Sequence, residues 1–252
     1  MIGVKNLFFK YLGSDKYALK KINLDFKKDK ITALMGENGS GKTTLLRLLA
    51  GFLKPTKGTV QKDEQEIGFS PEDPELGFFA EDVRSEVEFY PKNLDLDYKN
   101  KTKQTLLRMG ITHLKKELPN NLSSGEQRLV SLASVLSGDP DVLILDEPTH
   151  SMHRKGEERI GSVLRNIDET IIFSTHSSEF ALKYADELVV MHEGSVLAEG
   201  KPKNILTKEH LLNKAGIRLP GIVQWAKEKN LKTIPDSMEE AYSIAEKRGE
   251  LG

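Results

Sequence analysis

The sequence predicts an α/β protein whose core is a mostly parallel β-sheet with helices on both faces. Two short apolar runs, 142–145 and 170–174, alternate with patterns of helical period, and continuous apolar strands are typical of parallel sheets buried on both faces. A third apolar run, 31–35, leads directly into a glycine-rich loop and a further helical pattern. Hydrophobic residues make up 38% and charged residues 30% of the 252 residues, which favours a folded chain over a disordered one.

The first part of the chain predicts mainly strands. Residues 4–11 and 19–26 alternate roughly between apolar and polar side chains, which is the pattern of half-buried strands and indicates an antiparallel β subdomain. Residues 31–35 form a buried strand, and the helix after its glycine loop is expected to end at Gly51. Residues 58–69 are predicted to form another pair of strands.

The remainder divides into a helical lobe, the end of the sheet and a C-terminal extension. Residues 72–137 hold amphipathic stretches separated by prolines, which predict a helical subdomain inserted into the core. Residues 188–191 and 195–198 predict a hairpin across a short polar turn. We therefore predict a main domain over 1–205 and a helical extension over 206–252.

The composition excludes several classes of function. The chain has no cysteine, so disulfides, thiolate metal sites and cysteine nucleophiles are excluded. Its formal net charge of -1 gives no reason to expect nucleic acid as a partner. No apolar run approaches the ~18 residues that a spanning helix needs, and we see no signal peptide, so any action at a membrane is expected from outside the bilayer.

Residues 36–43 match the phosphate-loop pattern GxxxxGK(S/T). The glycines let backbone N–H groups converge on phosphate oxygens, and the helix that follows directs its positive end to the same place. Lys42 can reach the β- and γ-phosphates, and the Thr43 hydroxyl can bind Mg²⁺. The predicted nucleotide-binding residues of this loop are Gly36, Glu37, Asn38, Gly39, Ser40, Gly41, Lys42, Thr43 and Thr44.

The apolar strand 142–145 runs into Asp146 and Glu147. A carboxylate at the end of a buried strand, beside a phosphate loop, is placed to bind the metal ion of a nucleotide, so Asp146 is a predicted Mg²⁺ ligand. The adjacent Glu147 can polarise an attacking water. Taken alone, the same pattern fits a strand that is capped by two solvated acids, and the presence of the phosphate loop favours the catalytic interpretation.

Residues 122–127, Leu-Ser-Ser-Gly-Glu-Gln, open a further predicted helix. Their hydroxyl and backbone N–H groups form an anion site of the same physical kind as the phosphate loop. On spacing alone, a capping box formed by Ser123 and Glu126 is the better interpretation. Two anion sites on one chain indicate either two phosphate ligands or one ligand clamped between two chains.

In the order of these motifs, and over nearly its whole length, the chain resembles the ATPase subunits of ABC transporters. The resemblance implies a P-loop fold of ABC ATPase type that binds ATP and Mg²⁺ as a dimer. It also implies that His176, which is otherwise an ordinary loop histidine, is a switch histidine acting with Glu147. Tyr11 stands where the family has an aromatic that stacks on adenine; Tyr17 is a weaker candidate, and a core aromatic is the alternative for both. The signature residues, which would contact ATP on the opposite subunit's phosphate loop, are Ser123, Ser124, Gly125 and Glu126.

Within this family the chain is similar to the ATPases of energy-coupling-factor (ECF) importers, which include cobalt and nickel uptake systems. The similarity lies in residues 82–94, in Asp73-Pro74 and in 215–220, Ala-Gly-Ile-Arg-Leu-Pro. It implies a peripheral subunit on the cytoplasmic face of the membrane that powers uptake of a vitamin or a transition-metal ion. The implied partners are a second ATPase subunit, a transmembrane coupling subunit and a separate membrane substrate-binding subunit.

Two positions depart from the family pattern. The family has a Gln before the helical lobe that contacts Mg²⁺, and alignment on Asp73-Pro74 puts Glu72 at that position. The Glu72 carboxylate could still offer an oxygen to the ion. Gln65 lies on the wrong side of the strand 67–69 to take the place of the family Gln. His153 stands where the family has an Asp that shapes the composite site between subunits. We therefore predict a different partner ATPase that retains this Asp. The alternatives are a regulatory subunit that binds ATP with little or no hydrolysis, and a soluble ABC protein not coupled to transport.

Overall fold

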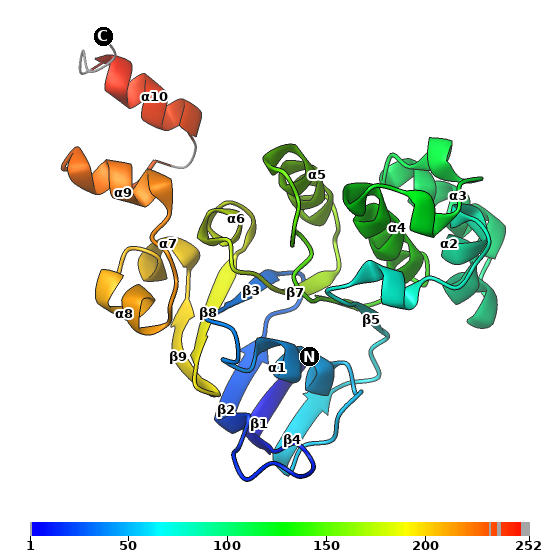
Figure 1. Cartoon of the computed structure of the whole chain (residues 1–252), viewed down its shortest axis with the longest axis horizontal. Helices are drawn as coiled ribbons and strands as arrows, with labels where there is room; N and C mark the ends of the chain where they lie inside the picture. The colour runs from blue at the N-terminus through cyan, green and yellow to red at the C-terminus, as the bar shows by residue number, and fades with distance from the viewer. Residues whose placement is uncertain (1, 232, 236–237, 248–252) are drawn as a thin grey trace.

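Two β-sheets form the centre of the molecule (Figure 1). The computed structural model describes residues 2–231, 233–235 and 238–247. The smaller sheet has the strand order β2-β1-β4, and the larger sheet has the order β5-β6-β7-β3-β8-β9. The strands are β1 Ile2–Phe9, β2 Leu19–Phe26, β3 Ile31–Met35, β4 Lys57–Lys62, β5 Ile67–Ser70, β6 Val142–Leu145, β7 Thr170–Ser174, β8 Glu187–His192 and β9 Ser195–Gly200.

The larger sheet is parallel from β5 to β8, and β9 alone pairs antiparallel, with β8. Every residue of β3, β6 and β7 is buried, which explains their continuous apolar sequences. This arrangement confirms the predicted mostly parallel core. Because parallel strands end at the same edge of a sheet, the segments that follow β3, β5, β6 and β7 meet there.

The predicted strand pair over 58–69 is wrong in its pairing, although both strands exist. Strand β4 pairs antiparallel with β1 in the smaller sheet, whereas β5 pairs parallel with β6 in the larger one. The side chains of β4 are mostly exposed, while those of β5 alternate between half-buried and buried. At Gly68 in β5, an added Cβ would lie 2.3 Å from Val135 Cγ1, so the strand is drawn against the helical subdomain rather than back onto β4.

The helices gather in three places (Figure 1). Helices α2, α3 and α4 form a helical subdomain beside the β5 edge of the larger sheet, as predicted; α1, α5 and α6 lie around the sheets, and α7 to α10 follow β9. Of the predicted extension 206–252, residues 232, 236–237 and 248–252 lie outside the described part. The helices are α1 Lys42–Leu49, η1 Pro74–Gly77, α2 Val83–Asn93, α3 Tyr98–Arg108, η2 Thr112–Leu114, η3 Pro119–Asn121, α4 Ser124–Leu136, α5 Arg154–Arg165, α6 Ser178–Tyr184, α7 Pro202–Ile205, α8 Glu209–Lys214, α9 Gly221–Glu228 and α10 Met238–Lys247.

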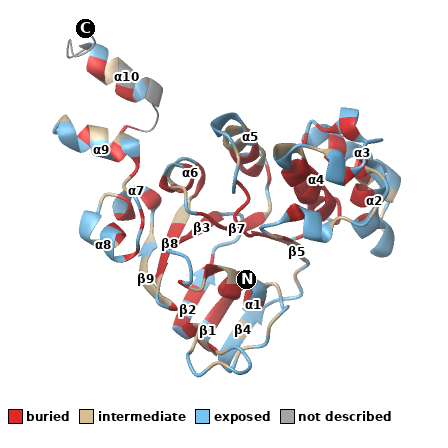
Figure 2. Ribbon diagram, viewed as in Figure 1, coloured by how far each residue is buried: buried red, intermediate tan, exposed pale blue. Residues whose placement is uncertain are grey.

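Buried apolar side chains join the sheets to the helices in two clusters, which Figure 2 shows as red stretches along the strands and α4. One cluster joins the larger sheet to the helical subdomain. The other packs α1 between the two sheets through Leu45, Leu46, Leu48 and Leu49. Burial of this helix face fixes where α1 begins, and therefore fixes the glycine loop before it. No helix in the described part of the chain is long and apolar enough to cross a membrane.

Candidate active site

The glycine loop between β3 and α1 adopts the conformation that a phosphate loop needs. Gly36, Gly39 and Gly41 have φ values of 150, 80 and 104°, a region that other residues rarely adopt. A Cβ on Gly36 would lie 2.2 Å from the carbonyl oxygen of Met191. The hydroxyl of Ser40 is buried without a hydrogen-bond partner, which is uncommon for a buried polar group and calls for a partner.

Lys42, the first residue of α1, is a buried cation at the centre of the loop. Its Nζ donates to the carbonyl oxygens of Gly36 at 2.8 Å and Glu37 at 3.3 Å, and lies 3.4 Å from Nε2 of His176. Burial lowers the pKa of Lys42, and the nearby carboxylates of Glu147 and Asp146 oppose that shift. An ammonium group with these surroundings is suited to an anionic ligand such as a phosphate.

The Asp146 carboxylate, directly after β6, accepts hydrogen bonds from two hydroxyl groups. The hydroxyl of Thr43 donates to Asp146 Oδ1 at 3.1 Å, and the hydroxyl of Ser174 donates to the same oxygen at 2.7 Å. The strand register pairs Leu145 with Phe173, so the next residues, Asp146 and Ser174, come side by side. A carboxylate next to a threonine hydroxyl is the oxygen donor set that Mg²⁺ prefers, so Thr43 and Asp146 fit this ion.

Glu147 lies in a strained and buried position. Its φ is 47°, and such left-handed backbone in a non-glycine residue is concentrated at functional sites. Its N–H donates to Ser174 Oγ at 2.8 Å, and its Oε1 lies 3.2 Å from His176 Nε2. Burial and the charge of Asp146 raise the pKa of Glu147 to about 7, against the opposing effect of Lys42. A carboxylate that titrates near neutral pH is suited to general-base work.

His176 follows β7 and completes this group. Burial, and then the charge of Lys42, lower the pKa of His176, which favours the neutral imidazole. A neutral ring can donate from one nitrogen and accept at the other, so it can bridge a carboxylate and a phosphate oxygen.

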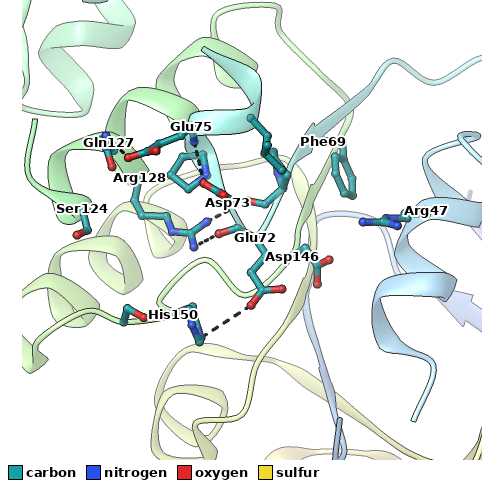
Figure 3. Close-up of a pocket in the computed structure, with 14 residues that line it drawn as sticks. Arg47, Phe69, Glu72, Asp73, Glu75, Ser124, Gln127, Arg128, Asp146 and His150 are labelled. Atoms are coloured by element: carbon teal, nitrogen blue, oxygen red, sulfur yellow. Dashed lines mark hydrogen bonds and ion pairs between the residues drawn. The ribbon is translucent and has the colours of Figure 1, made fainter. Parts of the chain in front are cut away.

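Glu72 faces a cavity of about 470 Å³ between β5, the start of α4 and the loop after Asp146 (Figure 3). Its Oε1 lies 4.0 Å from His150 Nδ1, and Asp146 lines the same cavity. The guanidinium of Arg128 donates to the carbonyl oxygens of Pro71 and Glu72, which holds this loop against α4. Gln65 precedes β5, at the far end of that strand from Glu72.

Tyr11 lies next to the start of α1. Its hydroxyl oxygen lies 2.9 Å from the hydroxyl of Thr44, and its ring packs edge-on against Phe9. The side chain remains 41% exposed, so the ring has surface left for a ligand. Tyr17 instead packs edge-on against Phe8. Of the two aromatic candidates, Tyr11 is the one that contacts a predicted nucleotide-binding residue.

The signature residues lie apart from the phosphate loop of their own chain. Ser123 caps α4, and the Glu126 carboxylate accepts from both the N–H and the hydroxyl of Ser123, at 3.0 and 2.6 Å. These bonds lower the pKa of Glu126 and show that the local capping role is real. Ser124 and Gly125 open the helix, which Figure 1 draws on the opposite side of β5 from α1.

The structure therefore brings together Lys42, Thr43, Asp146, Glu147 and His176, with Glu72 nearby and Tyr11 joined through Thr44. Sequence reasoning missed Ser174, which bonds both acidic residues, and Arg128, which holds the Glu72 loop. The sequence places Ser174 directly before Thr175-His176, but its bond to Asp146 depends on the register between β6 and β7.

The family of this chain follows from comparison with known proteins. The model of the ABC transporter family matches residues 19–150, which is more than half of the chain. The chain belongs to the ABC transporter ATPase family. Curated relatives named as energy-coupling factor transporter ATP-binding proteins match nearly the whole length of this ABC ATPase.

Individual relatives agree with this assignment. The energy-coupling factor transporter ATP-binding protein EcfA of Methanocaldococcus jannaschii is 32% identical over 98% of this ABC ATPase and 95% of its own length. A putative ABC transporter ATP-binding protein of Methanosarcina acetivorans is 36% identical over 90% of this chain, which spans only 37% of that relative's length. The solved structure of cbiO1 from Clostridium perfringens, part of the ABC transporter complex cbiONQ, has a TM-score of 0.77 and 32% identity, covering 90% of this chain and 98% of that one.

Proposed function

We propose that this ABC ATPase binds ATP with Mg²⁺ at the phosphate loop and hydrolyses it to drive uptake of a solute across a membrane. The observation that carries the proposal is the group at the sheet edge, where His176 Nε2 lies within 3.4 Å of both Lys42 Nζ and Glu147 Oε1. Binding groups for phosphate and a base for water are thus adjacent. This is the composition that phosphoryl transfer to water needs.

Each residue has a role that its contacts support. Lys42 and the loop N–H groups bind the β- and γ-phosphates, and Tyr11 offers its exposed ring to adenine. Thr43 and Asp146, with Glu72 close by, would hold Mg²⁺, which supplies charge neutralisation at the phosphates. Glu147 orients the attacking water and accepts its proton, while His176 holds the γ-phosphate and the Glu147 carboxylate in register.

ATP would lie between two ATPase chains. The separation between α4 and α1 in one chain (Figure 1) supports a role for Ser123, Ser124, Gly125 and Glu126 on the phosphates bound by a partner. The N-terminal end of a helix such as α4 suits an anion. Binding would close the two chains on ATP, and hydrolysis would release them.

The transport role rests on the relatives rather than on the site. Relatives named as energy-coupling factor transporter ATP-binding proteins match most of the chain, and cbiO1 is part of a transporter complex. We therefore place this ATPase on the cytoplasmic face of a membrane, with a second ATPase subunit, a transmembrane coupling subunit and a separate substrate-binding membrane subunit. The cargo class is a vitamin or a transition-metal ion such as cobalt or nickel.

Two substitutions at the composite site favour one alternative, a regulatory subunit that binds ATP without turning it over. His153, in the Asp position, directly precedes α5 and is an exposed residue whose side chain makes no capping bond. Glu72 adds a negative charge near Asp146 and Glu147, where a family Gln is neutral. Both changes would weaken hydrolysis more than binding.

The test is Mg²⁺-dependent ATP turnover by the purified chain over a wide range of protein concentration, beside its Glu147→Gln form. We expect the mutant to bind ATP with turnover reduced by at least about 100-fold, the scale of a lost general base. Activity that rises more steeply than protein concentration would support self-assembly. Wild-type turnover in Glu147→Gln would contradict the assigned role, and ATP binding without turnover at any concentration would favour the regulatory alternative.

A further inference from the structure

The turn between α8 and α9 contacts the phosphate loop directly. Ala215 caps the C-terminal end of α8 and is fully buried. Its carbonyl oxygen accepts the backbone N–H of Glu37 at 3.1 Å. The ECF-like stretch 215–220 thus begins with a hydrogen bond to the residue that follows the first glycine of the loop.

Gly216 is the residue that permits this close approach. Its φ of 64° is a conformation that side chains disfavour, and a Cβ added there would lie 3.2 Å from Glu37 Cβ and 3.4 Å from Glu37 Oε2. Any larger residue at 216 would therefore push Glu37, or be pushed by it. The contact is between one glycine and one side chain of the phosphate loop.

The opposite side of the loop is held by the hairpin turn after β8. His192 Nδ1 lies 3.2 Å from Glu37 Oε1, and the N–H of Gly194 donates to the carbonyl oxygen of Ser40 at 3.1 Å. The backbone N–H of Glu37 is therefore bonded to Ala215, and the Glu37 carboxylate lies beside the His192 ring. Neither contact is required by the phosphate-loop pattern itself.

The same turn reaches the other side of the site. The backbone N–H of Gly221, the first residue of α9, donates to Glu179 Oε1 at 3.2 Å. Glu179 lies in the first turn of α6, directly after the segment that carries His176. A short segment of the C-terminal extension thus bonds to residues next to both phosphate-binding elements.

We infer that the Ala215–Gly216 turn is a positioning element of the nucleotide site, which sets the phosphate loop for ATP by holding Glu37. The inference rests on the proposed function, because it assigns a role in ATP binding at the same site. A loop fixed in its binding conformation loses less conformational entropy when the ligand binds, so the contact strengthens binding without touching ATP.

The experiment is calorimetric titration of the full chain with a non-hydrolysable ATP analogue and Mg²⁺. Gly216→Ala adds the Cβ that would meet Glu37, and we expect the Kd to rise about tenfold, equal to about 1.4 kcal/mol, with unchanged stoichiometry. Gly110→Ala is the matched control, because Gly110 in the helical subdomain has a φ of 66° and carries the same backbone strain away from the loop. Its Kd should stay within about twofold of wild type.

A double-mutant cycle separates contact from strain. In a Glu37→Gly background the Cβ clash is gone, so Gly216→Ala should then raise the Kd by less than about threefold. An equal loss in both backgrounds would overturn the inference, as would an unchanged Kd in Gly216→Ala. A fall in stoichiometry at constant Kd would mean partial misfolding and would also overturn it.

A second variant keeps the test decisive if Gly216→Ala does not fold. His192→Ala removes the imidazole beside the Glu37 carboxylate. We expect the Kd for the ATP analogue to rise about threefold or more, again at constant stoichiometry. A wild-type Kd in this variant would overturn the inference. Failure of the wild-type chain to bind the analogue would overturn the proposed function and this inference together, whereas wild-type binding with unaffected variants would overturn the inference alone.

Discussion

Burial of the Glu147 carboxyl group and the charge of the neighbouring Asp146 raise the pKa of Glu147 from 4.5 to about 7. In the unfolded chain the same group ionises freely. The folded protein therefore carries an energetic cost whenever Glu147 is charged. Since burial is the largest cause of the shift, the cost comes mainly from the closed surroundings that also make Glu147 useful as a base.

This cost predicts that Glu147→Gln stabilises the apoprotein in a pH-dependent way. The folded pKa lies above the unfolded one, so the cost is absent below pH 4.5, grows between pH 4.5 and about 7, and is complete above that. The displacement from 4.5 to about 7 corresponds to roughly 3 kcal/mol at most. Urea unfolding at pH 5 and pH 8 should show the mutant gaining more stability over wild type at pH 8 than at pH 5.

Glu64→Gln supplies the reference for this experiment, because it removes a carboxylate from an exposed position. A gain of the same size in Glu64→Gln would mean that general surface charge, rather than the buried site, is responsible. An equal gain for Glu147→Gln at both pH values would contradict the linkage between its titration and folding.

At this scale the sequence predicted the residues that belong to contiguous motifs. Lys42, Thr43, Asp146 and Glu147 follow from loop and strand patterns, and His176 from a resemblance; their catalytic roles stay predictions. Contacts between distant segments could not be predicted. The bond from Ser174 to Asp146 depends on strand register. The hydrogen bond from Glu37 to Ala215 depends on the path of the chain after β9. Neither leaves a periodic trace in the sequence.

At the scale of the elements, helices α5 and α6 pack against each other at Gly161 of α5. In α5, an added Cβ on Gly161 would lie 2.3 Å from ring atoms of Tyr184 in α6. The Tyr184 ring also packs against Phe180, which in turn contacts Phe173 of β7. The ring therefore cannot retreat without disturbing the core strand that leads to Ser174 and His176.

We predict that Gly161→Ala destabilises the fold by about 1–3 kcal/mol, the usual cost of overpacking a core. Gly156→Ala in the same helix is the control, because the nearest atom to its added Cβ is the flexible end of Met152 at 2.7 Å. That change should be neutral or stabilise by up to about 1 kcal/mol through helix propensity. Urea unfolding measures both, and equal effects of the two substitutions would contradict the packing argument.

The elements themselves were largely predictable, while one pairing was not. Apolar runs placed β3, β6 and β7 within the sheet because each is buried along its whole length. The separation of β4 from β5 was missed because alternation identifies a strand but not its neighbour. What decides it is the approach of Gly68 to Val135, a contact with a helix far along the chain.

For the whole molecule, the main question is which second chain completes the ATP site. Ser123 and His153 directly precede α4 and α5, and Ser124 begins α4. Figure 1 draws α4 away from α1, which follows the phosphate loop, so these residues are candidates to complete that loop on a partner. In a pair of identical chains, His153 would stand at both composite sites. In a pair with a different ATPase that retains the Asp, only one site would be affected.

We therefore predict that His153→Asp raises ATP turnover of the chain alone. Restoring the carboxylate at both sites of a homodimer should increase turnover by about tenfold, or about 1.4 kcal/mol of transition-state stabilisation. His210→Asp, which makes the same change at an exposed position of α8, should leave turnover unchanged. Steady-state turnover at several protein concentrations measures both variants.

Mixing with candidate partner ATPases decides the composition. If the chain works in a heterodimer, turnover of the wild-type chain should rise sharply when the right partner is added. His153→Asp should then change only the ATP site on the partner's phosphate loop, because the Glu147 site of this chain is completed by the partner's own loop. Equal specific activity of the wild-type chain alone and in every mixture would contradict an obligate heterodimer. In that case the exposed imidazole at 153 is tolerated at both sites, and self-assembly is the working state.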